Sequence, residues 1–248
     1  MLLRYFTILT LTLSFLFCAY DQPLFEEYST ILRTVNKNRA TIEDSPLIEV
    51  GSSGIVMRRF ENSQETIIAR AVVLAKDGIS ALIELKPYDA LTQNTFPKLA
   101  IIPKSGDEIR LNYLYSRSLI VVPTYEDYKA VTDYFTKIDW VHPDIPAAYL
   151  AKKYTPNPDL KDFGELCSIN LTGLIVFSIE KKEYFVDCIS HKIIKVLSTD
   201  ETDDKKQLAD VVPFYSRISA NIQTSPLIIG DKRIKDYTSY YKKLLGIE

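Results

Sequence analysis

The chain has 248 residues, a formal net charge of −2 and 46% hydrophobic side chains, which is the composition of an ordinary globular protein. A chain of this length can form one large domain or two small ones with buried cores. The near balance of 30 basic and 32 acidic residues, with no basic stripe, excludes a surface built to bind nucleic acid.

The first nineteen residues have the pattern of a secretory signal peptide. Arg4 is their only charged residue, and an apolar run interrupted only by Thr and Ser extends from Tyr5 to Phe17. This run is too short to cross a membrane comfortably, and no later apolar run approaches that length, so no transmembrane span is expected after cleavage. We expect an exported protein in the periplasm or on the outer cell surface. The alternatives are a lipoprotein modified at Cys18 and an uncleaved membrane anchor.

Residues 20–122 are predicted to form a β-rich first half. Its strands are separated by turn sequences at 36–38, 51–54, 76–78 and 104–107, of which Asp77-Gly78 is a typical hairpin signal. Short strands with turn signals at this spacing predict a small barrel or sandwich. The expected strands cover residues 29–35, 40–42, 55–57, 66–74, 79–85, 99–102, 108–111 and 118–122.

Residues 123–248 are predicted to form a second half with both helices and strands, so the whole chain is assigned to the α+β class. Thr124 is a candidate helix cap because Asp127 follows three residues later, and Tyr128, Val131 and Phe135 then share one helical face. The next expected element is a helix opened by Asp144 and Pro146 that runs through 147–153, followed by strands at 174–179, 183–189 and 192–197. A closing helix has Ile234, Tyr237, Tyr241 and Leu244 on one stripe and Gly246 at its end.

Cys167 and Cys188 remain after signal cleavage, and in an oxidising compartment such a pair is a disulfide candidate. The bond would stabilise the fold by roughly 3 kcal/mol in the chain-entropy model. The alternative is two buried free thiols. The outer strands of a three-stranded meander lie about 9–10 Å apart, and a disulfide needs Cα atoms within about 7 Å. The segment around Cys167 should therefore pair with the far side of the Cys188 strand or cross the sheet end as a loop.

The two histidines do not form a convincing catalytic or metal site. His142 lies between Asp139 and Asp144, but a metal site needs three or four converging ligands, and a loop entering a helix capped by Asp144 is the simpler interpretation. His191 follows Cys188 by three residues, which point to opposite faces of a strand, and a nucleophilic pair would need a third group. We expect no catalytic residue, no metal ligand and no cofactor, and we predict that the protein is not an enzyme.

Lysines lie beside carboxylates at two places in the second half. Lys181 and Lys182 belong to Glu180-Lys-Lys-Glu183 at an expected hairpin tip, and Lys242 and Lys243 lie in the last turn of the closing helix. An exposed lysine beside a carboxylate presents a cation and an anion together, which is what a lysine-binding module recognises. The alternative is ordinary solvated charge that also complements the helix dipole. These four lysines are the candidate partner-binding residues.

Several sequence features occur in an order that resembles a known family. They are Val50–Val56 with its two glycines, Lys76–Gly78, Lys104–Asp107, the Leu119–Pro123 strand, the spacing of Cys167 and Cys188, Val212–Arg217 and Tyr240–Lys243. From about residue 46 to residue 246 the chain resembles the amino-terminal domain of plasminogen-binding proteins exported by certain Gram-negative gut and stomach bacteria. The resemblance implies an envelope or surface protein that captures host plasminogen through the lysine-binding kringles of plasminogen.

The chain departs from this family at its carboxy-terminal end. The family member compared extends into a long Lys- and Glu-rich tail that ends in lysine, whereas this sequence ends at Glu248. The fold can therefore match without plasminogen binding. A periplasmic structural or envelope-assembly module is the alternative function, and a small hydrolase is a third.

Overall fold

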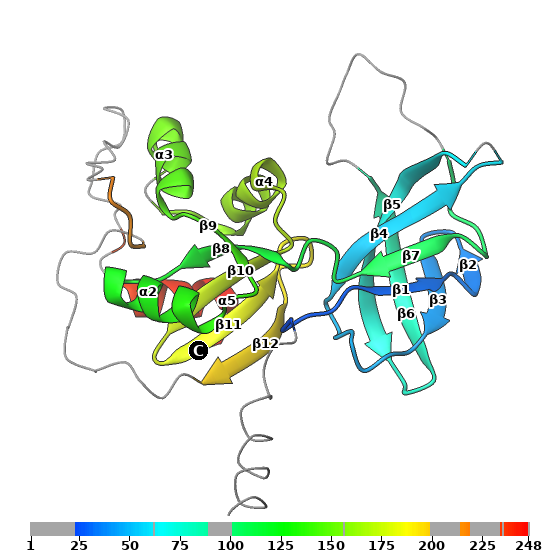
Figure 1. Cartoon of the computed structure of the whole chain (residues 1–248), viewed down its shortest axis with the longest axis horizontal. Coiled ribbons are helices and arrows are strands. Elements are labelled where there is room, and N and C mark those ends of the chain that lie inside the picture. The colour runs from blue at the N-terminus through cyan, green and yellow to red at the C-terminus, as the bar shows by residue number, and fades with distance from the viewer. Residues whose placement is uncertain are drawn as a thin grey trace, which may run out of the picture.

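The computed structural model describes residues 23–61, 63–88, 101–155, 157–198, 214–218, 234 and 236–247. They form a seven-stranded sheet, here called the barrel sheet, and a five-stranded sheet surrounded by helices, here called the mixed sheet (Figure 1). This arrangement confirms the predicted α+β class, with a β-rich first half and a mixed second half. The predicted signal peptide, residues 1–19, lies outside the described residues. Within those residues, no helix combines the length and apolar character needed to cross a membrane.

The barrel sheet has the strand order β1-β7-β4-β5-β6-β3-β2, and all neighbouring strands are antiparallel. Leu32 and Arg33 connect β1 directly to β2, although these strands stand at opposite ends of the order. The Leu32 N–H donates to the Asp107 carbonyl (2.9 Å) and the Arg33 N–H donates to the Thr41 carbonyl (2.8 Å). The sheet therefore curls until its two ends approach each other (Figure 1). Its strands are β1 (Tyr28–Ile31), β2 (Thr34–Asn36), β3 (Arg39–Glu43), β4 (Ser53–Arg59), β5 (Glu65–Lys76), β6 (Ser80–Pro87) and β7 (Glu108–Leu111).

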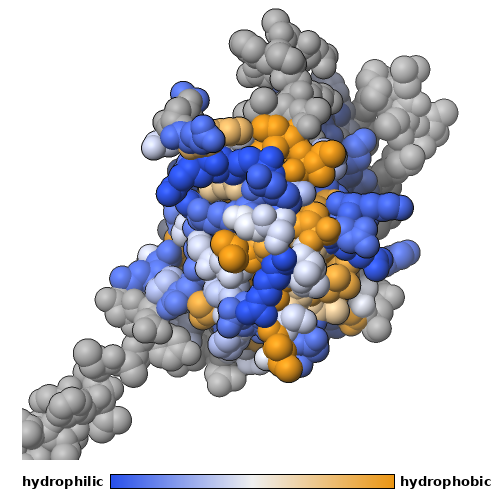
Figure 2. Space-filling view, turned by 90° about the vertical axis from the view of Figure 1, so that its right-hand side faces the viewer, coloured by the Kyte–Doolittle hydropathy of each residue, from blue (hydrophilic) through white to orange (hydrophobic). Residues whose placement is uncertain are grey.

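The concave face of the barrel sheet encloses an apolar core. In β6, Ala81, Ile83 and Leu85 are buried at the two-residue spacing that strand geometry dictates. Gly54 is required in β4 because a Cβ atom there would lie 2.0 Å from the Arg110 carbonyl oxygen of the neighbouring strand. The outer side of the barrel, seen in Figure 2, carries hydrophobic residues in separate patches among hydrophilic ones. The core therefore lies inside the curl.

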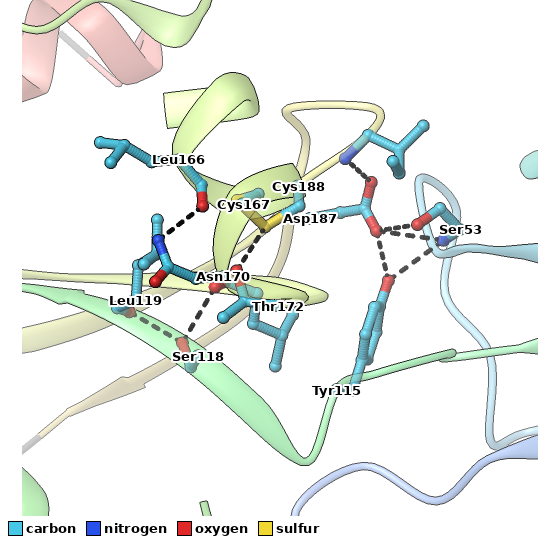
Figure 3. Close-up of a disulfide and its surroundings, with 12 residues drawn as sticks. Ser53, Tyr115, Ser118, Leu119, Leu166, Cys167, Asn170, Thr172, Asp187 and Cys188 are labelled. Carbon is cyan, nitrogen blue, oxygen red and sulfur yellow. Dashed lines mark hydrogen bonds between the residues drawn. A yellow bond between two sulfur atoms is a disulfide. The ribbon is translucent and has the colours of Figure 1, made fainter. Parts of the chain in front are cut away.

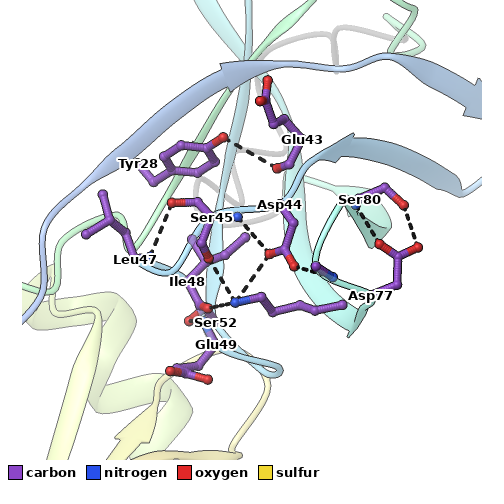
Figure 4. Close-up of polar contacts among 12 residues, drawn as sticks. Tyr28, Glu43, Asp44, Ser45, Leu47, Ile48, Glu49, Ser52, Asp77 and Ser80 are labelled. Carbon is purple, nitrogen blue, oxygen red and sulfur yellow. Dashed lines mark hydrogen bonds and ion pairs between the residues drawn. The ribbon is translucent and has the colours of Figure 1, made fainter.

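A polar network fixes the loop that leads from β3 to β4. The Lys76 ammonium donates to the Ser45 carbonyl (2.8 Å) and the Ile48 carbonyl (2.5 Å), and it lies 3.3 Å from the Asp44 carboxylate. Asp44 also accepts from the Gly78 N–H (3.0 Å), so the loop is held against the β5–β6 hairpin (Figure 4). This loop continues into residues 51–53, which contact the mixed sheet.

The mixed sheet has the strand order β12-β11-β10-β8-β9. Its strands are β8 (Arg117–Val121), β9 (Asp139–Val141), β10 (Leu174–Ile179), β11 (Lys182–Asp187) and β12 (Ile193–Ser198). β8 pairs in parallel with both β9 and β10, whereas β11 and β12 are antiparallel. The predicted boundary between the two halves was after residue 122. Because β8 pairs within the mixed sheet, the chain passes from one sheet to the other earlier, between Leu111 and Arg117.

Helices cover both faces of the mixed sheet. α2 (Tyr125–Tyr134) packs on the face that carries Ile120 and Val176, while α3 (Asp144–Lys153), α4 (Leu160–Asn170) and α5 (Tyr237–Leu245) pack on the face that carries Leu119 and Ile175. Neighbouring residues of one strand point to opposite faces, so both faces of the central strands can be apolar. The mixed sheet is therefore the middle layer of three (Figure 1).

Local capping signals located two helices correctly and misplaced one residue. Thr124 caps α2 by accepting from the Asp127 N–H (3.1 Å), and Gly246 ends α5 in the left-handed conformation at φ 66°, as predicted. The expectation that Asp144 caps its helix is wrong, because Pro143 occupies the cap position and Asp144 is the first residue of α3. α4 was not predicted from the sequence.

Candidate functional site

The four predicted partner-binding lysines lie on two elements that meet in space. Lys181 and Lys182 lie at the turn between β10 and β11, and Lys242 and Lys243 lie in the last turn of α5. The Lys242 ammonium is 2.6 Å from the carboxylate of Glu180, which belongs to the same β10–β11 turn. The hairpin tip and the helix end are therefore one continuous surface, here called the lysine surface.

The backbone at the hairpin tip is unusual for its residue types. Glu180 and Lys181 have φ of 49° and 62°, and Ile179 pairs directly with Lys182 across them. A two-residue hairpin turn with both central residues at positive φ favours Asn and Gly, because longer side chains are strained there. Asn or Gly at these two positions would form the turn with less strain. The turn conformation therefore does not explain why charged side chains occupy them.

Charge on the lysine surface is partly paired and partly free. The side chain of Glu180 is 58% exposed and that of Lys242 is 28% exposed. Lys182 and Lys243 are exposed, and neither forms an ion pair among the described residues. The surface thus presents free ammonium groups beside an accessible carboxylate.

The predicted Cys167–Cys188 disulfide is confirmed, with a Cα–Cα distance of 6.1 Å. Both predicted routes to it are wrong. Cys167 lies on α4, which packs on the face of the mixed sheet, and Cys188 follows the end of β11 (Figure 3). A helix crossing over the sheet brings the cysteines together without a neighbouring strand or a loop at the sheet end.

A buried carboxylate next to the disulfide joins the two sheets. Asp187, fully buried at the end of β11, accepts from the Ser53 hydroxyl (2.5 Å), the Ser53 N–H (3.2 Å) and the Tyr115 hydroxyl (2.7 Å). Its second oxygen accepts from the backbone N–H groups of Ile189 (2.9 Å) and Ser190 (2.5 Å). Burial, followed by the nearby Asp187 charge, raises the pKa of Tyr115 well above its ordinary value, so this phenol keeps the proton that it donates. Figure 3 shows Ser53 and Tyr115 pointing at this one side chain.

A cleft of about 850 Å³ lies between the barrel sheet and α4. Its lining comes from β4, β5, residues 113–114, one face of α4, and the turn that follows β11, and it includes both cysteines of the disulfide. This is a size typical of ligand-binding clefts. The cleft did not figure in the sequence predictions because its two sides are distant in the sequence.

His191 lines this cleft in a constrained position. Its φ is 54°, and its Nε2 atom is buried and has no hydrogen-bond partner among the described residues. A Cβ atom at Gly164 of α4 would lie 3.4 Å from this nitrogen. Burial lowers the pKa of His191 below its ordinary value, so the imidazole is neutral at pH 7.

Of the two acidic residues around His142, Asp144 lies beside it, with a carboxylate oxygen 3.5 Å from Nδ1, but both carboxylates are paired with arginines. Asp144 accepts from the Ser216 hydroxyl (2.9 Å) and from the backbone N–H (2.7 Å) and Nε (2.6 Å) of Arg217, while Asp139 lies 3.4 Å from Arg117. The described part of the chain contains no group of three or more His, Cys, Asp or Glu residues placed to hold a metal ion.

The family model described as plasminogen-binding protein pgbA N-terminal matches residues 27–245, which is most of the chain. The chain belongs to this family. The resemblance stated from the sequence is thereby confirmed. The family name associates the chain with plasminogen binding, and the disulfide is consistent with an extracytoplasmic location. No match was found among curated proteins.

In this member of the plasminogen-binding family, α5 covers the end of the mixed sheet at which the parallel strands β8 and β10 finish. In open sheets with parallel strands, ligands often bind beyond these carboxyl ends. The hydroxyl of Tyr237, from α5, lies within hydrogen-bonding distance of the Val121 carbonyl (2.8 Å) and the Ser178 carbonyl (3.1 Å), across the ends of β8 and β10. Burial raises the pKa of Tyr237 well above its ordinary value, so the phenol remains a donor. α5 therefore covers this edge.

Sequence reasoning missed Asp187, Ser53 and Tyr115, and it considered His191 only as a possible partner of Cys188. One signal was available for Asp187, because Asp often accepts from N–H groups two or three residues later and so marks a turn. Nothing local identified its partners, since Ser53 and Asp187 are 134 positions apart.

Proposed function

We propose that this member of the plasminogen-binding family is an exported, non-enzymatic protein of the cell envelope or surface that captures plasminogen through the lysine surface. The observation that carries the proposal is the ion pair between Lys242 and Glu180, which joins the hairpin tip to the end of α5. It places four lysines and an accessible carboxylate on one surface of a chain whose family is named for plasminogen binding.

The Lys242–Glu180 ion pair is weak enough for a binding partner to replace Glu180. An exposed ion pair contributes about 0–1 kcal/mol, so a lysine-binding module can displace Glu180 from Lys242 at little cost. A hydrogen bond to the lysine ammonium is electrostatically stronger in an enclosed site of such a module than in water, because the local dielectric is lower. The strained turn at Glu180 and Lys181 supports a role for these side chains outside folding.

The test is binding of the purified protein to immobilised plasminogen, with and without a free lysine analogue. We expect saturable binding that the analogue abolishes, and at least tenfold weaker binding by a Lys242→Ala/Lys243→Ala variant. A Lys181→Ala/Lys182→Ala variant should weaken binding in the same direction, because both pairs belong to one surface.

A matched control is Lys152→Ala/Lys153→Ala, which removes the lysine pair at the end of α3 and should bind plasminogen as the unaltered protein does. Binding that is absent, or that ignores the analogue, would contradict the proposal. The periplasmic structural or envelope-assembly role would then be the better account, and its partner would be sought inside the envelope.

A further inference from the structure

The cleft beside α4 exposes large apolar side chains that the fold does not use. Ile169 is 61% exposed, Leu171 is 62% exposed and Ile189 is 36% exposed, and all three line the cleft. Ile169 and Leu171 lie at the end of α4 and Ile189 follows Cys188, so the disulfide holds the segments that carry them together. Contiguous apolar exposure of this kind marks interaction sites in soluble proteins.

Leu171 is a poor choice for folding at its position. It is the residue that ends α4 in the left-handed conformation, with φ 53°, where Gly or Asn is favoured. Leu114 lines the same cleft and has φ 64°. A large apolar side chain that is both strained and exposed is retained against local preference, which is a feature of functional sites.

The shape of the cleft suits an extended chain. Leu160, Gly164 and Ser168 recur every four residues along α4 and form one wall, and Ile55 and Arg70 belong to the opposite wall. Gly164 has no side chain, so the helix wall is shallow at its centre. Eight residues of helix span roughly 12 Å, which equals the length of about four residues of extended peptide.

The charged groups of the cleft favour an acidic ligand. Lys161 and Arg70 are basic, and Lys161 forms no ion pair among the described residues. The carboxylate in the lining, Glu165, is already bound by the Lys153 ammonium and the Tyr149 hydroxyl, and the Lys153 hydrogen bond lowers its pKa. His191 is neutral at pH 7. Among these groups the charge without an ion-pair partner in the described part of the chain is that of Lys161, which is positive.

We propose that this cleft binds an extended segment of a partner protein whose central residues are apolar and whose flanking residues are acidic. The apolar residues pack on Ile169, Leu171 and Ile189, and the acidic residues face Lys161 and Arg70. This site is separate from the lysine surface and does not depend on plasminogen.

The test is selection of a phage-displayed library of random 12-residue peptides on the purified protein, with counter-selection on Leu171→Asp. We expect enriched sequences that combine adjacent apolar residues with Asp or Glu. A fluorescein-labelled peptide of the most enriched sequence should bind saturably. Its affinity should fall at least tenfold in Leu171→Asp and in Lys161→Glu.

Two further variants separate binding from folding. Leu171→Gly removes the side chain and suits the left-handed backbone, so it should weaken peptide binding without lowering the melting temperature. Ile79→Asp alters a side chain that is 78% exposed at the β5–β6 turn, away from the cleft lining, and should bind the peptide as the unaltered protein does.

Four outcomes would overturn the proposal. They are no enrichment that depends on Leu171, enrichment of basic peptides, saturable binding of sodium palmitate without peptide enrichment, and a dimer seen by light scattering that Leu171→Asp dissociates. The last two would assign the cleft to an acyl chain or to a second copy of this chain.

Discussion

Left-handed residues concentrate at the two proposed binding surfaces. Of the nine described non-glycine residues with positive φ, Glu180 and Lys181 belong to the lysine surface, and Leu114, Leu171 and His191 line the cleft. Each such residue costs roughly 1 kcal/mol relative to Gly or Asn. That most of them lie at these surfaces supports the interpretation that their side chains are kept for recognition.

At the same scale, His191 predicts a pH dependence of stability. Its pKa in the folded protein is lowered by burial, whereas in the unfolded chain it is near the ordinary value of 6.5. As pH falls through about 6.5, His191 becomes protonated in the unfolded chain but not in the folded protein. The free energy of unfolding therefore decreases with falling pH. We expect the melting temperature to fall between pH 7.5 and 5.5, and to fall less in His191→Asn, which tolerates the left-handed backbone.

The measurement is thermal unfolding followed by circular dichroism at several pH values in this range. The control His142→Asn keeps His191 and should retain the pH dependence of the unaltered protein. An identical decrease in His191→Asn and in the unaltered protein would contradict the assignment to His191.

Among the elements, α4 does the most to shape the candidate sites. A reciprocal capping box starts it, in which Asp159 accepts from the Asp162 N–H (2.9 Å) and Asp162 accepts from the Asp159 N–H (3.1 Å). Phe163 and Leu166 bury one side against the mixed sheet, and Gly164 faces the cleft. The disulfide then ties the end of the helix to the turn after β11.

Removing this disulfide should destabilise the protein. We expect a Cys167→Ala/Cys188→Ala variant to lose about 3 kcal/mol of unfolding free energy, because the bond restricts the unfolded chain over a separation of 21 residues. Urea unfolding at constant pH measures this loss. Dithiothreitol should lower the stability of the unaltered protein to that of the variant and leave the variant unchanged. A loss below about 1 kcal/mol would show that packing of α4, and not the covalent bond, sets its stability.

At the scale of the whole molecule, buried polar contacts connect the two sheets. Ser53 of β4 binds Asp187 of β11, and the Ser190 hydroxyl donates to the Gly51 carbonyl (2.7 Å). Five donors converge on the Asp187 carboxylate in a site without solvent access. Such a network strongly favours one relative placement of the sheets, because each unpaired donor would remain buried.

Asp187→Asn should therefore loosen both sheets. The amide nitrogen of the new Asn side chain would face N–H and O–H donors that Asp187 now accepts from. We therefore expect the free energy of unfolding, measured with urea, to fall by about 3 kcal/mol. Hydrogen–deuterium exchange should become faster at residues 51–54 and at residues 188–191 together. The control Asp139→Asn alters an exposed carboxylate paired with Arg117 and should change stability by less than about 1 kcal/mol. Faster exchange on one side only would show that the sheets are held together by other contacts.

The sequence predicted features that depend on residues close to one another in the chain. Apolar alternation located most strands, Thr124 and Gly246 located two helix ends, and Asp77-Gly78 located the β5–β6 hairpin. The Cys167–Cys188 bond followed from the presence of only two cysteines after the predicted cleavage site. The α4 helix was missed, although Asp159 is a favoured cap residue, because its apolar face is short.

By itself, the sequence determined the class of the fold and the family, and it identified the cysteine pair and the lysines to consider. The tertiary structure decided that the hairpin tip and the end of α5 form one surface, that Asp187 binds Ser53 and Tyr115, and that α4 faces the barrel sheet across a cleft. Capping, turn and periodicity signals act over a few residues, so they can be identified from the sequence alone. Contacts between residues such as Glu180 and Lys242 form only when the two sheets and their helices pack, and no local pattern records them.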